Sequence, residues 1–277
     1  MGLRINTNVA SLQAQNALSK VTSETQDSSA KLSSGQRINK ASDDAAGLAI
    51  SEKLKSEIRS SQQAGRNAND GISLVQVAEG GMNESSNILT RMRELAVQAA
   101  SDTVGDEERA MSNLEYQQLK QEIERVSQVT EFNGKKLLDG NAEKMEFQVG
   151  TGSDEFKDRV AFEPNQLNTG LESLGITGAS VTSKEGAQES LDTLDSAIQK
   201  LSGQRASVGA LQNRLVSTSN NIAVYTENMS AANSRIRDVD YAEETAKQAR
   251  NSVISAASTS VLAQANMSTS NALKLIG

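Results

Sequence analysis

The sequence contains no cysteine and no histidine among its 277 residues. These two absences exclude disulfide bonds, thiolate nucleophiles, imidazole bases and zinc sites built from cysteine or histidine, so serine–histidine–aspartate catalysis is excluded as well. There is also no tryptophan, a single proline (Pro164) and only 3% aromatic residues. Such a composition offers little material for a bulky globular core and favours a thin helical bundle.

Carboxylates are the remaining groups that could perform acid–base chemistry. The closest pairs are adjacent in sequence: Asp43-Asp44, Glu107-Glu108 and Glu243-Glu244. Neighbouring side chains on a helix point about 100° apart, so these pairs are poorly placed to act together on one substrate. We interpret them as solvated surface charges and expect no catalytic, cofactor-binding or metal-binding residue.

The net charge and the N-terminal residues limit which partners are possible. The formal net charge is −7, without the clustered lysines and arginines that nucleic-acid binding needs. The chain starts Met1-Gly2-Leu3-Arg4 and continues into a polar run instead of an apolar core, so we expect no cleavable secretory signal. We expect neither nucleic acid nor membrane insertion, and the predicted partners are other copies of the chain.

Residues 239–277 predict an amphipathic helix made of small side chains. Apolar residues recur at every third or fourth position at Ala242, Ala246, Ala249, Val253, Ala257, Val261 and Ala265. No charge occurs between Asn251 and Leu273, yet 12 of those 23 positions are Ser, Thr, Asn or Gln, which is too polar for a membrane span. A helix that buries so little area must gain its order from close neighbours, so we interpret it as half of an assembly interface.

The other half of that interface is predicted near the N-terminus. Residues 5–19 are also uncharged, and a coiled-coil pattern of alternating three- and four-residue steps runs through Leu18, Val21, Thr25, Ser28 and Leu32 after an initial Ile5, Val9 and Leu12. Both ends are weakly hydrophobic, so we expect them to be frayed outside an assembly. The residues expected to carry the inner contacts are Ile5, Val9, Leu12, Val253, Ala257, Val261 and Leu262.

Between these ends the sequence predicts a joint and two helices. Gly35 is a stop signal for the first helix, and Ser42-Asp43-Asp44 is a start signal for the second, with Asp43 and Arg235 expected to act at the joint. Helical spacing then continues to about residue 101. After a turn at residues 101–106, a shorter helix around residues 116–130 should fold back on the long one.

The period then changes from helical to alternating. Residues 144–149 and 159–163 alternate polar and apolar, which predicts a β-hairpin near residues 143–163, after turns at Phe132-Asn133-Gly134 and Asp139-Gly140-Asn141. Glycine-rich residues 166–187 are predicted to form a tip loop. A second long helix starts at Leu191 and leads back to the C-terminal helix, which places both chain ends at one pole and the hairpin toward the other.

The expected fold class is therefore mainly α: an elongated antiparallel coiled-coil or helical bundle with a small β-hairpin, plus a terminal two-helix coiled coil. The expected domains are an N-terminal inner helix over residues 1–42, an outer bundle over residues 43–233 and a C-terminal inner helix over residues 234–277.

The chain resembles bacterial flagellin, the subunit of the flagellar filament, over nearly its whole length. The stretches that carry the resemblance are Ile5-Asn6-Thr7-Asn8, Leu32-Ser33-Ser34-Gly35, Arg37-Ile38-Asn39, Asp43-Asp44-Ala45-Ala46-Gly47-Leu48-Ala49-Ile50, Arg93-Glu94-Leu95-Ala96-Val97-Gln98, Phe132-Asn133-Gly134, Ser234-Arg235-Ile236-Arg237-Asp238 and Val261-Leu262-Ala263-Gln264-Ala265-Asn266. The resemblance implies a secreted structural protein of cell motility that forms a helical homopolymer. It also implies a short form without the variable outer domains that longer members insert near residues 165–187.

The resemblance also implies partners and surface sites. The implied partners are a flagellar export chaperone, the filament cap protein and the hook–filament junction protein, with export through the flagellar type III apparatus. The positions matching the family's innate immune receptor surface are Arg91, Leu95 and Glu115. We favour the alternative interpretation that Arg91 and Glu115 form a packing ion pair between facing helices. Separately, the exposed-loop residues Ser180, Thr182 and Ser183 are candidates for O-glycosylation.

Two other functions were weighed against a filament subunit. A hook–filament junction protein shares the terminal helices, but residues 93–98 and 132–134 are more like those of filament flagellin. An enzyme built on a flagellin-like frame is disfavoured because the chain has no histidine and its insertion region is too short for an added domain.

Overall fold

The computed structural model describes residues 7–274 and divides into two compact units. One, here called the terminal unit, comprises the described residues up to Ile58 together with those from Glu227 onward. The other, here called the bundle unit, runs from Arg59 to Thr226. The mainly helical fold class with small antiparallel strand pairs is confirmed. The elements in chain order are α1 (Val9–Ser34), α2 (Ala45–Ala99), α3 (Asp106–Val129), β1 (Glu131–Phe132), β2 (Lys135–Lys136), β3 (Met145–Gln148), α4 (Glu155–Asp158), β4 (Arg159–Phe162), η1 (Pro164–Leu167), α5 (Leu171–Leu174), α6 (Lys184–Arg237) and α7 (Tyr241–Lys274).

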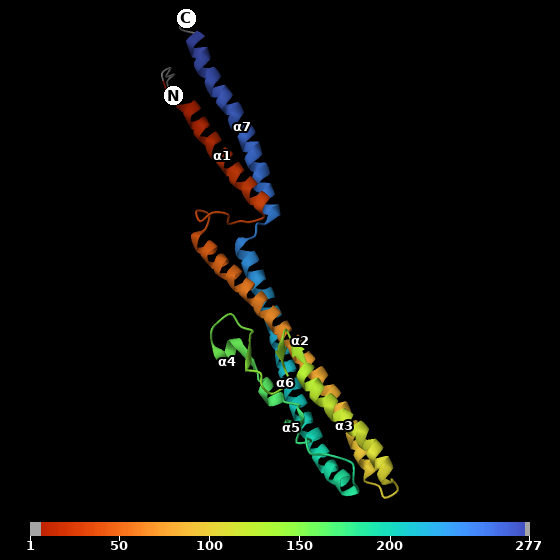
Figure 1. Ribbon diagram of the computed structural model, residues 1–277. Coiled ribbons are helices and arrows are strands. Elements are labelled where there is room, and N and C mark those ends of the chain that lie inside the picture. Colours follow the sequence, from red (N-terminus) through yellow and green to blue (C-terminus); the bar gives the residue numbers. More distant parts are fainter. Residues whose placement is uncertain (1–6, 275–277) are drawn as a thin grey trace. The chain divides into compact units, whose positions relative to one another are not determined.

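In the terminal unit, α1 and α7 lie side by side and antiparallel (Figure 1). At one end of the pair the Asn8 side chain donates a hydrogen bond of 2.9 Å to the Ala265 carbonyl oxygen, and at the other end the Tyr241 hydroxyl donates one of 3.1 Å to Leu32. Helix α1 begins where the Asn8 side chain accepts a hydrogen bond from the Ser11 backbone, and it ends at Gly35, whose φ of 71° favours glycine. The predicted two-helix coiled coil of the chain ends is therefore present.

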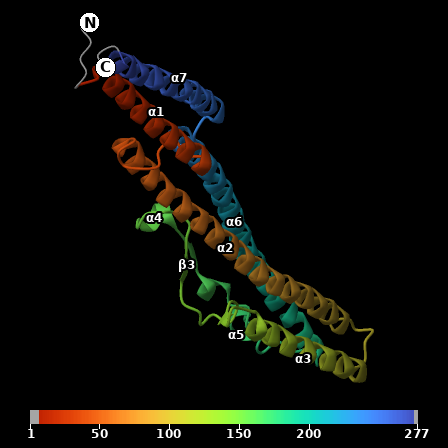
Figure 2. The ribbon, with the colours of Figure 1, turned by 90° about the horizontal axis from the view of Figure 1, so that it is seen from above.

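The bundle unit consists of parts of α2 and α6 with α3 folded back against α2 (Figure 2). The antiparallel direction of α2 and α6 is visible in their contacts, since Asn69 meets Ser219 and Arg93 forms an ion pair with Asp195. The turn between α2 and α3 is closed by the buried Arg109, which donates hydrogen bonds of 2.9 Å to the carbonyl oxygens of both Ala99 and Ser101. The guanidinium thus satisfies carbonyl groups that the end of α2 leaves open.

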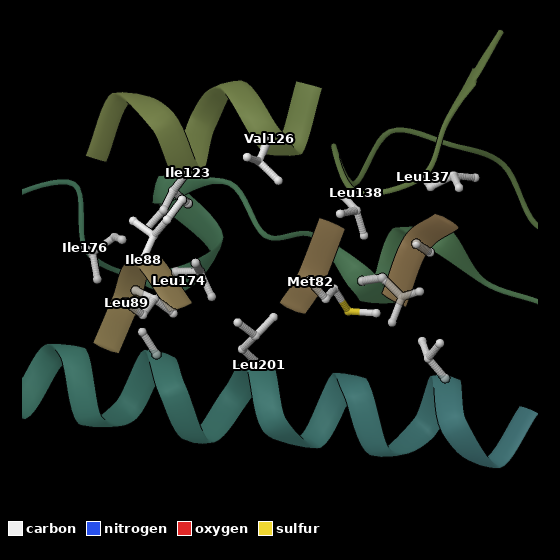
Figure 3. Close-up of a cluster of buried hydrophobic side chains, with 14 of the residues drawn as sticks. Met82, Ile88, Leu89, Ile123, Val126, Leu137, Leu138, Leu174, Ile176 and Leu201 are labelled. Carbon is white, nitrogen blue, oxygen red and sulfur yellow. The ribbon is translucent and has the colours of Figure 1, made fainter. Parts of the chain in front are cut away.

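A continuous apolar core fills the space between these helices (Figure 3). Helix α2 contributes two adjacent rows of buried residues, because it is covered by α6 on one side and by α3 and the loops on another. The fully buried members with the largest side chains include Met82, Leu89, Met92, Tyr116, Ile123, Leu137, Leu138, Ile176, Leu194, Leu201 and Leu215. This core accounts for how a chain with few aromatic residues still forms a packed bundle.

Two small hairpins follow α3. In the first, Asn133 (φ 51°) and Gly134 (φ 75°) form the two-residue turn between β1 and β2, as the sequence predicts. In the second, β3 pairs antiparallel with β4 in a register that places Phe147 opposite Val160, which confirms the predicted β-hairpin. Its connection also contains the short helix α4, which was not predicted.

The hairpin lies beside an early part of α2 in the bundle unit. The Asn67 side chain donates a hydrogen bond of 3.0 Å to the Gln148 carbonyl oxygen, and a Cβ on Gly71 would lie 3.1 Å from the Phe147 ring. The end of the bundle is formed instead by the α2–α3 turn and the start of α6, which Lys184 and Asp102 join by an ion pair of 2.7 Å. Within the bundle unit the hairpin therefore lies against the side of α2, where Gly71 leaves room for the Phe147 ring.

Residues 166–187 are more ordered than the predicted tip loop. They include the end of η1, all of α5 and the start of α6, which begins at Lys184 instead of Leu191. Three apolar residues among the glycines, Leu174, Ile176 and Val181, are buried, and the Lys120 ammonium donates hydrogen bonds to the carbonyl oxygens of Thr177 and Ala179. Because clusters of glycine usually indicate loops, the sequence did not predict that these apolar residues reach the core.

Candidate functional site

The residues expected to make the inner assembly contacts lie on two faces of the terminal pair. Val9 and Leu12 of α1 and Val253, Ala257 and Val261 of α7 are exposed, and we call these five the outward apolar residues. Val253 is 71% exposed and Val261 is 58% exposed. Leu262 is half-buried, and Ile5 lies outside the described residues.

The seam between α1 and α7 follows a different set of residues. On α1 the buried and half-buried positions include Ser11, Ala14, Leu18, Val21, Thr25, Ser28 and Leu32, which agrees with the predicted pattern from Leu18 onward. On α7 they are Glu244, Gln248, Asn251, Ser255, Ser258, Leu262 and Ala265. Both sets keep the alternating three- and four-residue steps of a coiled coil, but the α7 side is mostly polar.

In this seam the Ser28 hydroxyl and the Asn251 side-chain amide nitrogen have no hydrogen-bond partner among the described residues. The Glu244 carboxylate forms an ion pair of 3.8 Å with Lys247 of the same helix. Each buried polar group left without a partner costs about 1–3 kcal/mol. At the same time, valines of α7 point away from α1. Helix α7 therefore brings mostly polar side chains to the seam and leaves valines exposed, which is unlike a self-sufficient coiled coil.

The joint between the helices is built by a crossing of two chain segments in the terminal unit. Gln36 and Asp238 form an isolated antiparallel bridge, and the Val239 backbone donates a hydrogen bond of 3.0 Å to the Gly35 carbonyl oxygen. Asp43 holds the turn that follows: its carboxylate accepts hydrogen bonds from the backbone of Lys40 at 2.9 Å and of Asn39 at 3.0 Å. These two bonds, the one from Lys40 foremost, lower the pKa of the Asp43 carboxyl below its usual value.

Two further arginines, Arg37 and Arg237, make hydrogen bonds across this crossing. Arg235 is exposed, whereas Arg237 donates hydrogen bonds to Gln36 at 3.0 Å and to Glu52 at 2.5 Å. Arg37 donates one of 2.7 Å to the Ile236 carbonyl oxygen. Arg235 and Arg237 both lie in the last turn of α6, so the preference for a basic residue there does not distinguish them.

The positions matched to the receptor surface belong to the bundle unit. The Arg91 guanidinium forms an ion pair of 2.8 Å with Glu115, from α2 to α3, and another of 3.0 Å with Glu94. The hydrogen bonds to Glu115 and then to Glu94 raise the pKa of Arg91. Leu95 is buried at 3% exposure and packs in the core, so it is not displayed on the surface with the other two.

The three glycosylation candidates differ in what their hydroxyl groups do. The Ser183 hydroxyl accepts a hydrogen bond of 3.1 Å from the Gly186 backbone and so caps the start of α6. The Ser180 hydroxyl lies 3.0 Å from that of Thr182, and Ser180 is half-buried beside Ser190. Thr182 is exposed.

Two family models match most of this sequence. The bacterial flagellin N-terminal helical region matches residues 5–143, and the bacterial flagellin C-terminal helical region matches residues 191–276. The chain belongs to the bacterial flagellin family. The short form expected from the resemblance fits its length of 277 residues.

Relatives match over almost the full length. The flagellin of Halalkalibacterium halodurans is 41% identical over 272 residues, which cover 98% of this chain and 99% of that protein. The flagellin of Bacillus subtilis is 41% identical over 308 aligned residues, covering 99% of this chain and 100% of that one. Among solved structures, Bacillus cereus flagellin has a TM-score of 0.50 at 34% identity, covering 61% of this chain and 94% of that one. A hook-associated protein from Vibrio parahaemolyticus shares the fold, with a TM-score of 0.58 at 15% identity, covering 71% of this chain and all of that one.

Membership of the family settles the general function. The chain is a structural subunit that polymerises into the extracellular filament of the bacterial flagellum for motility, and it is not an enzyme. Among residues 7–274, no helix contains an apolar stretch long enough to cross a bilayer.

Proposed function

We propose that the outward apolar residues of α1 and α7 make the contacts between copies that hold the inner part of the filament together. The observation that supports this proposal is the arrangement of polar and apolar residues on α7. Val253 and Val261 face away from α1 while Asn251 and Ser258 occupy the seam, so α7 turns polar residues toward α1 and leaves its valines exposed. A neighbouring copy is the surface against which these valines would leave water.

The assembly mechanism follows from burial. An interface of the head-to-tail kind, in which one surface of each copy meets a different surface of the next, does not close and generates a helix of subunits. Each added copy covers apolar side chains that it could not cover alone. The terminal helices thereby gain in the polymer the stabilisation that their own seam does not supply.

Seeded polymerisation tests this proposal. Replacing both Val253 and Val261 with serine should raise the critical concentration for growth by a hundredfold or more, because each lost valine burial is worth about 1.5 kcal/mol, or roughly tenfold. The control is Ser258→Ala, which changes the seam and keeps both valines. Equal critical concentrations for the double variant and the wild-type chain would contradict the proposal.

The proposal includes the domain boundaries predicted from the sequence: inner segments over residues 1–42 and 234–277, and an outer bundle over residues 43–233. Asp43 and Arg235 keep their proposed place at the joint, where Arg235 is exposed and open to a neighbouring copy. Limited proteolysis of the isolated chain, followed by mass spectrometry, tests the boundaries. Stable fragments that begin near residue 43 and end near residue 233 support them, and cleavage first within the bundle contradicts them.

The partners beyond the chain itself are a flagellar export chaperone, the filament cap protein and the hook–filament junction protein, with export through the type III apparatus. The exposed valines of α7 support a chaperone that covers them before assembly. Co-purification of the chaperone with the wild-type chain, and its loss with the Val253→Ser and Val261→Ser double variant, is the expected result. Equal retention by both chains would contradict it.

Two roles remain open for Arg91 and Glu115. Their exposed ion pair supports a role in packing α2 against α3, and the same exposed groups could contact an innate immune receptor. Arg91→Ala separates these roles when the thermal stability of the chain and receptor activation are both measured. A loss of activation with unchanged melting temperature supports the receptor surface, and the opposite result supports packing.

O-glycosylation in residues 180–183 is best supported at Thr182, because Ser183 caps α6 and Ser180 is half-buried. Intact-mass measurement of shed filaments tests the modification. A mass above that of the 29.4 kDa chain that returns to it in Thr182→Ala supports the site, and the chain mass alone contradicts it.

A further inference from the structure

The Arg237 side chain joins three segments of the terminal unit at the joint. Its Nε donates a hydrogen bond of 3.0 Å to the Gln36 side chain in the connection between α1 and α2. One of its terminal nitrogens donates to Glu52 at 2.5 Å and to Ser51 at 3.4 Å, both on α2. The Arg237 side chain is only 15% exposed, so these contacts are partly shielded from water and are stronger than those of a surface ion pair.

Other hydrogen bonds cross the same place in the opposite direction. The Arg37 backbone donates one of 2.7 Å to the Arg237 carbonyl oxygen, and the Arg37 side chain donates one of 2.7 Å to the Ile236 carbonyl oxygen. Both acceptors are carbonyl groups that the end of α6 leaves open. The hydroxyl of Ser51 donates a hydrogen bond of 2.8 Å to Asn233. The joint is therefore a polar network with Arg237 at its centre.

Apolar burial contributes little at this joint. Among the described residues of the terminal unit, three apolar side chains are buried: Ala14, Val21 and Ile38. Ala14 and Val21 lie in the seam of α1, so Ile38 is the member of this set that lies at the joint. It packs against the start of α2, where a Cβ on Gly47 would lie 2.8 Å from its side chain. One apolar contact allows rotation about itself, whereas hydrogen bonds to several segments set a direction.

We propose that Arg237 and Glu52 form a clamp that fixes the direction of the terminal pair relative to the start of α2 before a copy joins the filament. Arg237 is then a positioning residue, which acts through the α1–α7 pair and needs no contact with a neighbouring copy. A pair that is already held in its bound direction loses less conformational freedom on assembly, so the clamp favours growth. The effect on growth rests on the inner interface proposed above.

The first test measures the joint in the isolated full-length chain. Because the chain has no cysteine, Ser56→Cys on α2 and Glu243→Cys on α7 place two spin labels at exposed positions of the terminal unit. The distance distribution between the labels should be narrow in this parent chain and wider after Arg237→Ala. Glu52→Gln keeps the size of the side chain, removes its charge and should widen the distribution too.

The matched control is Lys53→Ala, which removes an exposed cation next to Glu52 and should leave the distribution narrow. A broad distribution in the parent chain, or an equally narrow one after Arg237→Ala, would overturn the proposal.

The second test measures the critical concentration for seeded growth. Arg237→Glu places a second carboxylate opposite Glu52 and should raise the critical concentration about tenfold, because the hydrogen bonds to Gln36 and Glu52 are lost. Adding Glu52→Arg restores opposite charges and should return most of the loss. A charge-reversed pair that grows no better than Arg237→Glu alone would overturn the proposal.

The clamp and the inner interface can fail separately. The distance measurement involves no polymer, and the valine variants leave Arg237 and Glu52 unchanged. Wild-type growth of the valine double variant together with a widened distribution in Arg237→Ala would contradict the inner interface and support the clamp.

Discussion

The bundle unit and the terminal unit share the same helical spacing, but they place different kinds of side chain at the positions between their helices. In the bundle, the seam positions of α2 and α6 hold Met82, Leu89 and Leu201, all buried within one chain. In the terminal pair, the seam of α7 holds Glu244, Asn251 and other polar residues. Both regions are regular helices with coiled-coil steps, yet only the first has the apolar interior that makes such a pair stable alone.

This difference indicates which part of the subunit is complete by itself. The bundle keeps its core whether or not a neighbour is present. The terminal pair leaves polar atoms without partners in its seam and valines in water, so it gains most from neighbours. A filament built in this way adds subunits whose bundle unit is already folded. The terminal pair of each subunit then gains its final stability from contacts with neighbouring copies.

The largest expected effect comes from removing one member of the terminal pair. A chain shortened to end at residue 249, or to begin at residue 31, should keep the helical signal and cooperative unfolding of the bundle, because the apolar core lies within residues 59–226. It should form no filaments in electron micrographs of seeded samples. Filaments grown from either shortened chain would contradict the claim that assembly depends on the terminal pair.

Matched leucine truncations give the next largest effect. Leu89→Ala, in the buried core of α2, should lower the unfolding free energy by about 2–5 kcal/mol. Leu12→Ala, at a half-exposed position of α1, should change it by less than about 0.5 kcal/mol and raise the critical concentration instead. Denaturant unfolding and seeded growth of both variants test this split. Equal losses of stability would contradict it.

Repairing the seam should have an intermediate effect. Asn251→Leu removes a buried side-chain amide whose nitrogen donates no hydrogen bond. The substitution should stabilise the terminal pair of the isolated chain by about 1–3 kcal/mol. Hydrogen exchange of α7 in the isolated chain would then slow relative to wild type. Thr259→Ala, at an exposed position of the same helix, is the control that should leave exchange unchanged. Faster exchange in the Asn251 variant would contradict the interpretation of the seam.

Much of the helical order was accessible from periodicity, because three- and four-residue steps identify seam positions such as Leu18 and Ser28 without further information. Turn chemistry identified Gly35 and Asn133-Gly134 in the same way. Periodicity does not say which side of a helix meets its partner within the chain. The stripe through Val253 and Val261 was therefore recognised as an interface although it faces away from α1.

The features that the sequence did not predict depend on contacts between residues far apart in the chain. The hydrogen bonds of Arg237 depend on Gln36 and Glu52, which lie far from it in the sequence. The burial of Leu95 follows from the packing of α3 over α2, which separates it from Arg91 and Glu115. The segment between α5 and α6 is ordered in part by a buried lysine of another helix, Lys120, which donates hydrogen bonds to the carbonyl oxygens of Thr177 and Ala179.

The smallest expected effect concerns acid pH at the joint. Because the Asp43 pKa is lower in the folded chain than its ordinary value of 3.8, its stabilising contribution is complete above that value and is lost as the pH falls through the folded pKa. Carboxyl NMR titration should therefore report a midpoint for Asp43 below 3.8. In Asp43→Asn this part of the pH dependence of unfolding should disappear. A midpoint at or above the ordinary value would contradict the hydrogen bonds assigned to this carboxylate.

Hydrogen–deuterium exchange measured on the isolated chain and on filaments tests the dependence of the terminal pair on neighbours most directly. In the isolated chain, amides of α1 and α7 should exchange far faster than those around Leu89 and Leu201, and in filaments all of them should be protected. Equal protection of α1, α7 and the bundle core in the isolated chain would contradict the claim that neighbouring copies complete the terminal unit.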